Sequence, residues 1–162
     1  MNDESIKYQS YASPLGEIVV YASREGLRGL IMSEAKGEKP SLPMEEGEND
    51  SLIKARAQLE EYFQGARRDF SLPMDLKGTP FQQQLWRLLT QIKGGQVMTY
   101  GQLAKRMGSI KLSRAVGQAC GSNPLPIIVP CHRVLAKGMK LGGYSSGLEN
   151  KKSLLRLEGI EI

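Results

Sequence analysis

The chain has 162 residues, of which 40% are hydrophobic, and a formal net charge of +5. This length suits one medium domain or two small ones with a substantial core. No apolar stretch approaches the ~20 residues that a membrane-spanning helix needs, and the first ten residues lack the apolar core of a signal peptide. We therefore expect a globular protein of the cytoplasm rather than a membrane or secreted protein.

The charge is divided unequally along the chain. Residues 1–77 hold 10 Lys and Arg against 14 Asp and Glu, whereas residues 78–162 hold 12 against 3, so the two parts carry −4 and +9. Clustered cations attract the phosphates of nucleic acids, but a basic face that meets only solvent has the same composition. The charge alone leaves both interpretations open.

The N-terminal part has the pattern of a small antiparallel sheet with one helix. Residues 15–32 contain short β-branched runs separated by glycines, which is typical of strands joined by tight turns. Residues 33–50 are acidic and rich in Gly and Pro, and they predict a mobile surface loop. From Ser51 to Phe63 apolar residues recur at helical spacing, and Gly65 is a typical stop signal.

The segment FSLPMDLKG, residues 70–78, predicts a strand or a linker, and the charge balance changes sign within it. We therefore expect two domains, an N-terminal α+β domain over residues 1–77 and a C-terminal domain over residues 78–162.

Two helix starts in the C-terminal part carry the same capping-box signature, Thr79–Gln82 and Thr99–Gln102. The first helix is expected to end at Gly94-Gly95. The second is short, and a further helix follows it to about Cys120. Two short helices joined by a tight turn are typical of a helix-turn-helix, although helical hairpins are also common in proteins that bind no DNA.

The last of these helices, SRAVGQACG, combines small side chains with a single charge, that of Arg114. Its backbone could approach a partner closely, as a helix in a narrow DNA groove does, with Arg114 inserted as a wedge. Small residues also serve packing between helices. The pattern alone gives these two interpretations similar weight.

The segment IIVPCHRVL, residues 127–135, places the only histidine, His132, directly after Cys131. We expect a buried strand before Pro130, which ends it because proline cannot donate a ladder hydrogen bond. A free cysteine is most often inert core, but His132 and Arg133 adjoin this thiol, and neighbouring cations favour the thiolate. Consecutive side chains on an extended chain point to opposite faces, which works against direct contact between imidazole and sulfur.

Together these segments resemble the O6-alkylguanine-DNA alkyltransferases, also called methylated-DNA–protein-cysteine methyltransferases. The resemblance lies in PCHRV preceded by RAVGQACGSNPLPIIV, with GTPFQQQLW and MTYGQLA upstream and GGYSSGLENKKSLLRLEG downstream. SPLGEIVVYASREGL and QLEEYFQG extend it more loosely to the N-terminal part. It implies an α+β fold, with a ribonuclease-H-like small antiparallel sheet and helix, then a mostly helical, winged-helix-like domain that contains the helix-turn-helix.

The resemblance also implies the reaction, which is DNA repair by a single irreversible transfer. Cys131 would take the alkyl group from O6 of guanine, with O4-alkylthymine as a further substrate. His132 would act through a bound water, and Glu158 would orient its imidazole. Asn123 would tie the helix-turn-helix to the active-site strand, and Tyr100 would contact the base, help turn it out and protonate guanine N3.

By the same resemblance, Arg114 would fill the stack that the flipped base leaves. The residues expected to contact the minor groove of double-stranded DNA are Arg114, Tyr100, Ala115, Gly117 and Ser113. The residues expected around the flipped base are Tyr144, Ser145, Ser146 and Val134. Ser146 stands where relatives often carry glycine or tryptophan, which leaves the size of the pocket open.

No cofactor or metal is expected, because residues 1–77 contain neither Cys nor His and so lack the zinc ligands that some relatives hold there. A single transfer requires only a monomer. Two alternatives remain, a non-catalytic protein that binds alkylated bases and recruits other factors, and a thiol hydrolase, for which His132 is poorly placed. A stable adduct on Cys131 would support transfer, and more than one turnover would support hydrolysis.

Overall fold

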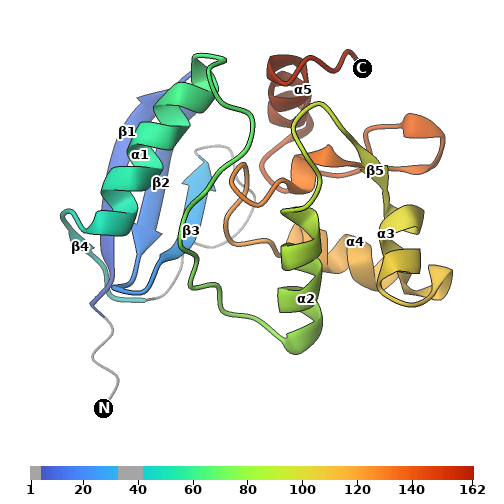
Figure 1. The fold of residues 1–162 in the computed structure, drawn as a ribbon, viewed down its shortest axis with the longest axis horizontal. Helices are drawn as coiled ribbons and strands as arrows, with labels where there is room; N and C mark the ends of the chain where they lie inside the picture. Colours follow the sequence, from blue (N-terminus) through green and yellow to red (C-terminus); the bar gives the residue numbers. More distant parts are fainter. Residues whose placement is uncertain (1–4, 33–41) are drawn as a thin grey trace.

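The computed structural model describes residues 5–32 and 42–162 (Figure 1). A sheet covered by helix α1 (Asp50–Phe63) forms one side of the molecule, and the remaining helices form the other side. Among the described residues, no helix is long and apolar enough to cross a membrane. The expected α+β class is confirmed, with the sheet in the N-terminal half and mostly helices in the C-terminal half.

The sheet has the strand order β3-β2-β1-β4. β2 pairs antiparallel with both β1 and β3, as the strand pattern predicted. β4 runs parallel to β1, so part of the segment expected to be a loop, residues 33–50, belongs to the sheet. Residues 42–44 and 47–49 are neither helix nor strand, as expected, and residues 33–41 lie outside the described residues. The strand bounds are β1 (Lys7–Ser13), β2 (Gly16–Ala22), β3 (Leu27–Met32) and β4 (Glu45–Glu46).

Helix α1 begins and ends as its sequence predicts. The side chain of Asn49 accepts a hydrogen bond from the Leu52 N–H and caps the helix. Gly65 follows with a φ of 80°, which glycine adopts without steric cost, and its N–H donates to the Tyr62 carbonyl. The buried side chains Leu52, Ala55 and Leu59 therefore face the sheet.

Both capping boxes in the C-terminal half are formed. They begin α2 (Pro80–Leu89) and α3 (Tyr100–Arg106), and in each the Thr side chain and the Gln side chain bond reciprocally to the backbone. α2 ends at Leu89, earlier than the glycine pair predicted. A 3-10 turn, η1 (Ile110–Leu112), leads from α3 into α4 (Ser113–Gly121), which completes the helix-turn-helix.

The expected buried strand before Pro130 is absent, and this prediction is wrong. Leu125, Ile127 and Val129 are fully buried, but the segment folds as consecutive turns, with Ile127 at a φ of 74°. The physical reason lies in the sequence PLPIIVP, whose three prolines have no N–H to donate to a sheet.

The chain then passes through the segments that shape the site. These are the 3-10 turn η2 (Cys131–Arg133), β6 (Val134–Leu135), which pairs in parallel with β5 (Met98–Thr99), the 3-10 turn η3 (Lys137–Met139) and α5 (Leu148–Leu157).

One continuous apolar core joins the two halves of the molecule. The linker runs beside β3, where Leu27 exchanges backbone hydrogen bonds with Pro73 and Asp75. The Leu30 N–H, also in β3, donates to the carbonyl of Pro124 at 2.9 Å. The N-terminal half is thus bonded directly to the turns that lead to Cys131.

Candidate active site around Cys131

Cys131 opens the turn η2, where its side chain is 5% exposed. The Nδ2 amide of Asn123 lies 3.1 Å from its sulfur and also donates to the Val129 carbonyl at 2.8 Å. The Oδ1 of Asn123 accepts from the Leu125 N–H at 3.0 Å. The side chain of Asn123 thus ties the end of α4 to the turns and to the thiol.

The thiol lines a hollow of about 320 Å³. Residues from α3, α4, η2 and the loop before α5 form its wall. They are Tyr100, Gly117, Cys120, Gly121, Cys131, Gly143, Tyr144 and Ser145. Both cysteines of the chain are free and border this space.

Cys131 rests as a neutral thiol, contrary to the expectation of a thiolate. Burial raises its pKa above the usual value of 9.0, although the hydrogen bond from Asn123 and the positive charge of Lys151 act in the opposite direction. Arg133 does not help, because its guanidinium is bonded to Glu158 and Asp69 instead. The thiol must therefore lose its proton during a reaction.

His132, the residue that follows Cys131, forms a buried pair with Glu158. His132 Nε2 is 2.7 Å from Glu158 Oε2, and neither side chain is exposed. A carboxylate only accepts hydrogen bonds, so Nε2 carries the hydrogen and Nδ1 of the neutral ring is a proton acceptor. Nδ1 has no hydrogen-bond partner in the described part of the chain. Burial lowers the pKa of His132 and keeps the ring neutral.

Glu158 caps the end of α5 and stays ionised. Burial raises its pKa, but the hydrogen bonds and charges of His132 and Arg133 outweigh burial and bring the pKa down to about 2. Arg133 holds both carboxylate oxygens, with Nε 2.7 Å from Oε1 and Nη2 3.0 Å from Oε2. It also donates to the carbonyls of Ile92 and Arg68. The carboxylate is thereby fixed.

Two family models match this chain. The ribonuclease-like domain of 6-O-methylguanine DNA methyltransferase matches residues 6–76, and the DNA binding domain of the same protein matches residues 80–160. The chain belongs to the 6-O-methylguanine DNA methyltransferase family. The resemblance seen in the sequence is confirmed.

Known members of the methyltransferase family are similar over nearly their whole length. The methylated-DNA–protein-cysteine methyltransferase of Methanosarcina acetivorans is 42% identical, over 94% of this chain and 97% of the relative. The constitutive one of Bacillus subtilis is 41% identical, over 94% and 95%. The crystal structure of Mycobacterium tuberculosis OGT in complex with DNA superposes with a TM-score of 0.88 at 37% identity, covering 94% of this chain and 93% of that chain.

Within this methyltransferase fold, the residues predicted on α4 lie on its accessible surface. Arg114 is exposed, and Ser113 and Ala115 are half-buried. A Cβ added at Gly117 or Gly121 would meet no atom within 4 Å apart from the nearby backbone of its own helix. Packing inside the protein therefore does not require glycine at these two positions, whereas Ala119 on the opposite side of the helix is buried in the core. The small residues of α4 serve helix packing at Ala119 and leave an open surface at the two glycines.

Two residues predicted around the base do not line the hollow. Val134 is fully buried in β6, and Ser146 is 2% exposed beneath the loop. The Ser146 carbonyl accepts a hydrogen bond from Asn150 on α5 at 2.8 Å, which anchors this end of the loop. Tyr144 and Ser145 of the same loop do reach the hollow.

One residue of the site was missed by the sequence interpretation. Lys151 is fully buried, and its Nζ donates to the carbonyls of Val134 at 2.7 Å, Gly143 at 3.0 Å and Leu141. Burial lowers its pKa to about 8, while the nearby thiols of Cys131 and Cys120 act to raise it. Lys151 therefore fixes the loop that borders the hollow and adds positive charge near the sulfur.

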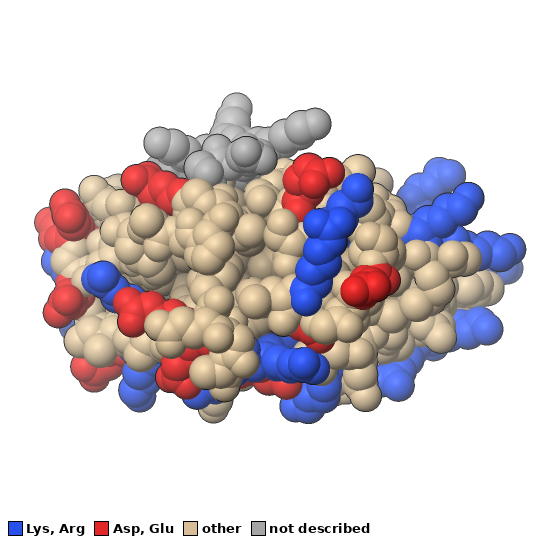
Figure 2. Space-filling view, turned by 90° about the horizontal axis from the view of Figure 1, so that it is seen from above, with Lys and Arg blue, Asp and Glu red and all other residues tan. Residues whose placement is uncertain are grey.

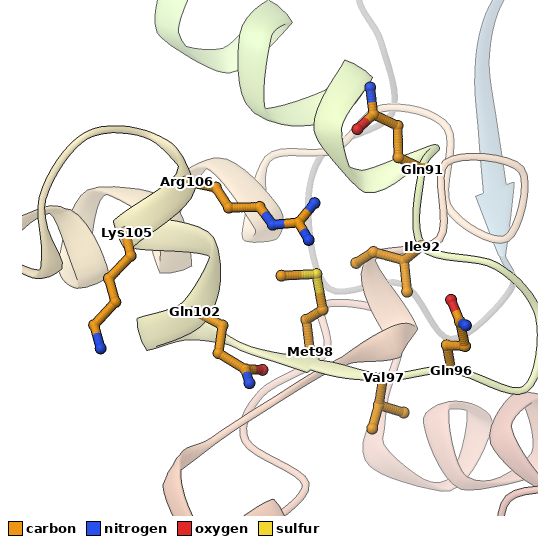
Figure 3. Close-up of a pocket in the computed structure, with 8 residues that line it drawn as sticks. All are labelled: Gln91, Ile92, Gln96, Val97, Met98, Gln102, Lys105 and Arg106. Atoms are coloured by element: carbon orange, nitrogen blue, oxygen red, sulfur yellow. The ribbon is translucent and has the colours of Figure 1, made fainter.

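Lys and Arg gather at one end of the molecule, on the side where Figure 1 places α3 (Figure 2). Exposed cations of this half include Lys105, Arg106, Lys111 and Arg114. A second hollow, of about 630 Å³, lies between the end of α2, β5 and α3, and the side chains of Arg106 and Met98 point toward each other across it (Figure 3). It is larger than the hollow at Cys131, but neither thiol lines it, so it is not the reactive site.

Proposed function

We propose that this protein repairs alkylated DNA by transferring the alkyl group from O6 of guanine to the sulfur of its own Cys131. One observation carries the proposal: a free thiol borders a hollow, and the residue that follows it is the only histidine of the chain, which is paired with a buried carboxylate. Membership of the methyltransferase family supports the reaction class.

In the proposed reaction, the Cys131 sulfur attacks the alkyl carbon while the bond between that carbon and guanine O6 breaks. The thiol proton passes to Nδ1 of His132 through a water molecule, as the family resemblance implies. Glu158 stabilises the imidazolium that forms. The guanine leaves with the electron pair of the broken bond. The product is a thioether, which is not a leaving group under cellular conditions, so each molecule acts once.

Two further residues assist the departure of guanine and of the thiol proton. Tyr100 borders the hollow, and burial raises the pKa of its phenol to about 12, so it retains a proton that it can donate to guanine N3. Lys151 stabilises negative charge on the sulfur as the thiol ionises. Tyr144 and Ser145 close the space over the base.

The DNA partner is double-stranded and contacts the protein through its minor groove. Exposed Arg114 and the open surface at Gly117 support a close approach of α4, with Arg114 filling the vacated stack. We also infer a domain boundary between Lys77 and Gly78, where the acidic part meets the basic part, and a cytoplasmic location, which the two free cysteines support.

The decisive experiment is intact-protein mass spectrometry after mixing with duplex DNA that carries one O6-methylguanine. We expect one methylene of added mass, mapped by peptide analysis to Cys131. Cys120→Ser is the matched control, because this thiol borders the same hollow, and it should still take up the group. Cys131→Ser should not, although it should bind DNA. A methyl group on Cys120, or release of methylated product with repeated turnover, would contradict the proposal.

A further inference from the structure

A tyrosine of the N-terminal half reaches the buried pair. Tyr62 lies on α1 and is 1% exposed. Its hydroxyl donates to Oε2 of Glu158 at 2.6 Å, and the same oxygen lies 2.7 Å from Nε2 of His132. One carboxylate oxygen therefore joins the N-terminal half to the imidazole.

The phenol of Tyr62 is held in place and acts only as a donor. Its ring packs edge-on against Phe63, with centroids 5.4 Å apart, and against Phe70 at 5.3 Å. Burial, together with the negative charge of Glu158, raises its pKa well above the usual value. The hydroxyl thus keeps its proton at neutral pH and can donate the hydrogen bond to Glu158.

The hydroxyl of Tyr62 is one of the hydrogen-bond donors that surround the carboxylate of Glu158. Oε2 accepts from Tyr62, from His132 and from Nη2 of Arg133, whereas Oε1 accepts from Nε of Arg133. A donor to a carboxylate oxygen stabilises its negative charge, which weakens the attraction of that oxygen for the imidazole proton. Removing the hydroxyl would leave Glu158 less constrained and more attractive to the proton.

We propose that Tyr62 is a positioning residue for alkyl transfer, which fixes Glu158 and thereby sets the orientation and basicity of His132. This inference rests on the proposed function at Cys131. Tyr62 touches neither the thiol nor the hollow, and it acts through Glu158. The N-terminal half then has a direct part in the chemistry as well as in the stability of the fold.

Other charged and titratable groups face the buried pair and remain in place when the hydroxyl is removed. They are Arg133 on η2, Lys151 on α5, Tyr144 on the loop, and Asp69, which contacts Arg133. A change measured in Tyr62→Phe therefore reports the lost hydroxyl.

The test compares wild-type protein with Tyr62→Phe, which keeps the ring and its packing. Tyr11→Phe is the matched control, since the Tyr11 hydroxyl is also buried in the N-terminal half but has no hydrogen-bond partner among the described residues. Two quantities are measured across pH 5 to 9. One is the single-turnover rate of methyl transfer from duplex DNA, and the other is the NMR titration of the histidine. The signal is unambiguous in an untagged protein because His132 is the only histidine.

We expect Tyr62→Phe to lose roughly threefold to tenfold in the plateau rate, as expected for part of a hydrogen bond to a charged group. The titration of His132 and the acid limb of the rate should both move to higher pH. Tyr11→Phe should match the wild type in both. Melting curves ensure that all variants are compared when folded.

An unchanged His132 titration and an unchanged rate in Tyr62→Phe would overturn the inference, and so would a lower melting temperature as the only effect. The outcome is separate from that of the proposed function. If the wild type placed no methyl group on Cys131, the proposed function would fail, yet the His132 titration would still decide whether Tyr62 sets the basicity of the imidazole.

Discussion

The amide of Asn123 contacts the sulfur of Cys131, with Nδ2 3.1 Å from Sγ, while the same nitrogen donates to the Val129 carbonyl at 2.8 Å. A donor to sulfur favours the thiolate, so this contact opposes the effect of burial on the thiol. The backbone bond holds the turns in which the thiol is presented. One side chain thus links the structure of the site to its reactivity.

Asn123→Ala should therefore weaken both stability and transfer. The change leaves the Leu125 N–H without its side-chain partner, at a cost of about 1–3 kcal/mol for a buried group left unsatisfied. The Val129 carbonyl loses one of its two donors and keeps the hydrogen bond from the Cys131 N–H. It also raises the pKa of Cys131 further. Urea unfolding and single-turnover rates on O6-methylguanine duplex check the two effects. A rate equal to that of the wild type would mean that Asn123 contributes only structure.

The rate of transfer should depend on pH through His132. The neutral ring is the proton acceptor, and burial lowers its pKa below the usual 6.5. The rate should therefore rise with pH on an acid limb below 6.5 and stay level from there through neutrality. Single-turnover rates between pH 5 and 8 measure this limb. A midpoint above 6.5 would show that the ring is less buried in the reacting complex or that another group accepts the proton.

Arg114→Ala should slow repair in duplex DNA far more than reaction with the free modified base. Arg114 is exposed on α4 and has no role in the apolar core, so the fold should be retained. Only the duplex leaves a gap in the stack after the base is turned out. Rates are compared on a duplex and on free O6-methylguanine, and equal losses on the two substrates would exclude a role in filling the stack.

Gly117→Ala offers a test of the contact surface of α4. The added Cβ meets no atom within 4 Å apart from the nearby backbone of its own helix, and alanine in a helix interior is favoured over glycine by about 0.5–1 kcal/mol. The variant should melt at a higher temperature. It should nevertheless bind duplex DNA more weakly, because the added methyl group would stand between α4 and the DNA groove that the helix is proposed to approach. Gly117 also borders the hollow that receives the base. Unchanged affinity in titrations of labelled duplex would show that α4 does not approach the groove this closely.

Local signals in the sequence predicted the parts of the fold that depend on neighbouring residues. The Thr and Gln of each capping box are three positions apart, and both boxes are formed. The strand expected before Pro130 is not formed, because the three prolines of PLPIIVP have no N–H to donate to a sheet. Side-chain burial was predicted correctly there, but the backbone conformation was not.

The polar groups around the thiol depend on partners that are distant in sequence. Lys151 lies on α5, an ordinary amphipathic helix. Its burial depends on carbonyls of β6 and of the loop that precedes α5. Arg133 was interpreted as a cation that activates its neighbour, but it is bonded to Glu158, 25 residues away, and to Asp69, 64 residues away. A basic residue next to a cysteine in the sequence therefore says little about the charge that the sulfur experiences.

Repair should also lower the stability of the protein. The sulfur lies against Asn123 on one side, and the alkyl group arrives from the hollow on the other, where Tyr100, Tyr144 and Cys120 form the wall. Extra atoms in a packed site typically cost ~1–3 kcal/mol. We expect the cost to be relieved by movement of Asn123 and the adjoining end of α4. Among the backbone hydrogen bonds described, only the bond from the Leu30 N–H to the Pro124 carbonyl ties this segment to the N-terminal half.

Alkylated protein should therefore melt at a lower temperature, by about 2–4 °C for each kcal/mol in a protein of this size. Proteases should cleave it faster near residues 109–125. The effect should be larger for a benzyl group than for a methyl group, because the hollow of about 320 Å³ must then hold a whole ring. Thermal melts of unmodified, methylated and benzylated protein measure this, with Cys131→Ser exposed to the same reagents as the control. Identical midpoints would show that the hollow already accommodates the product without strain.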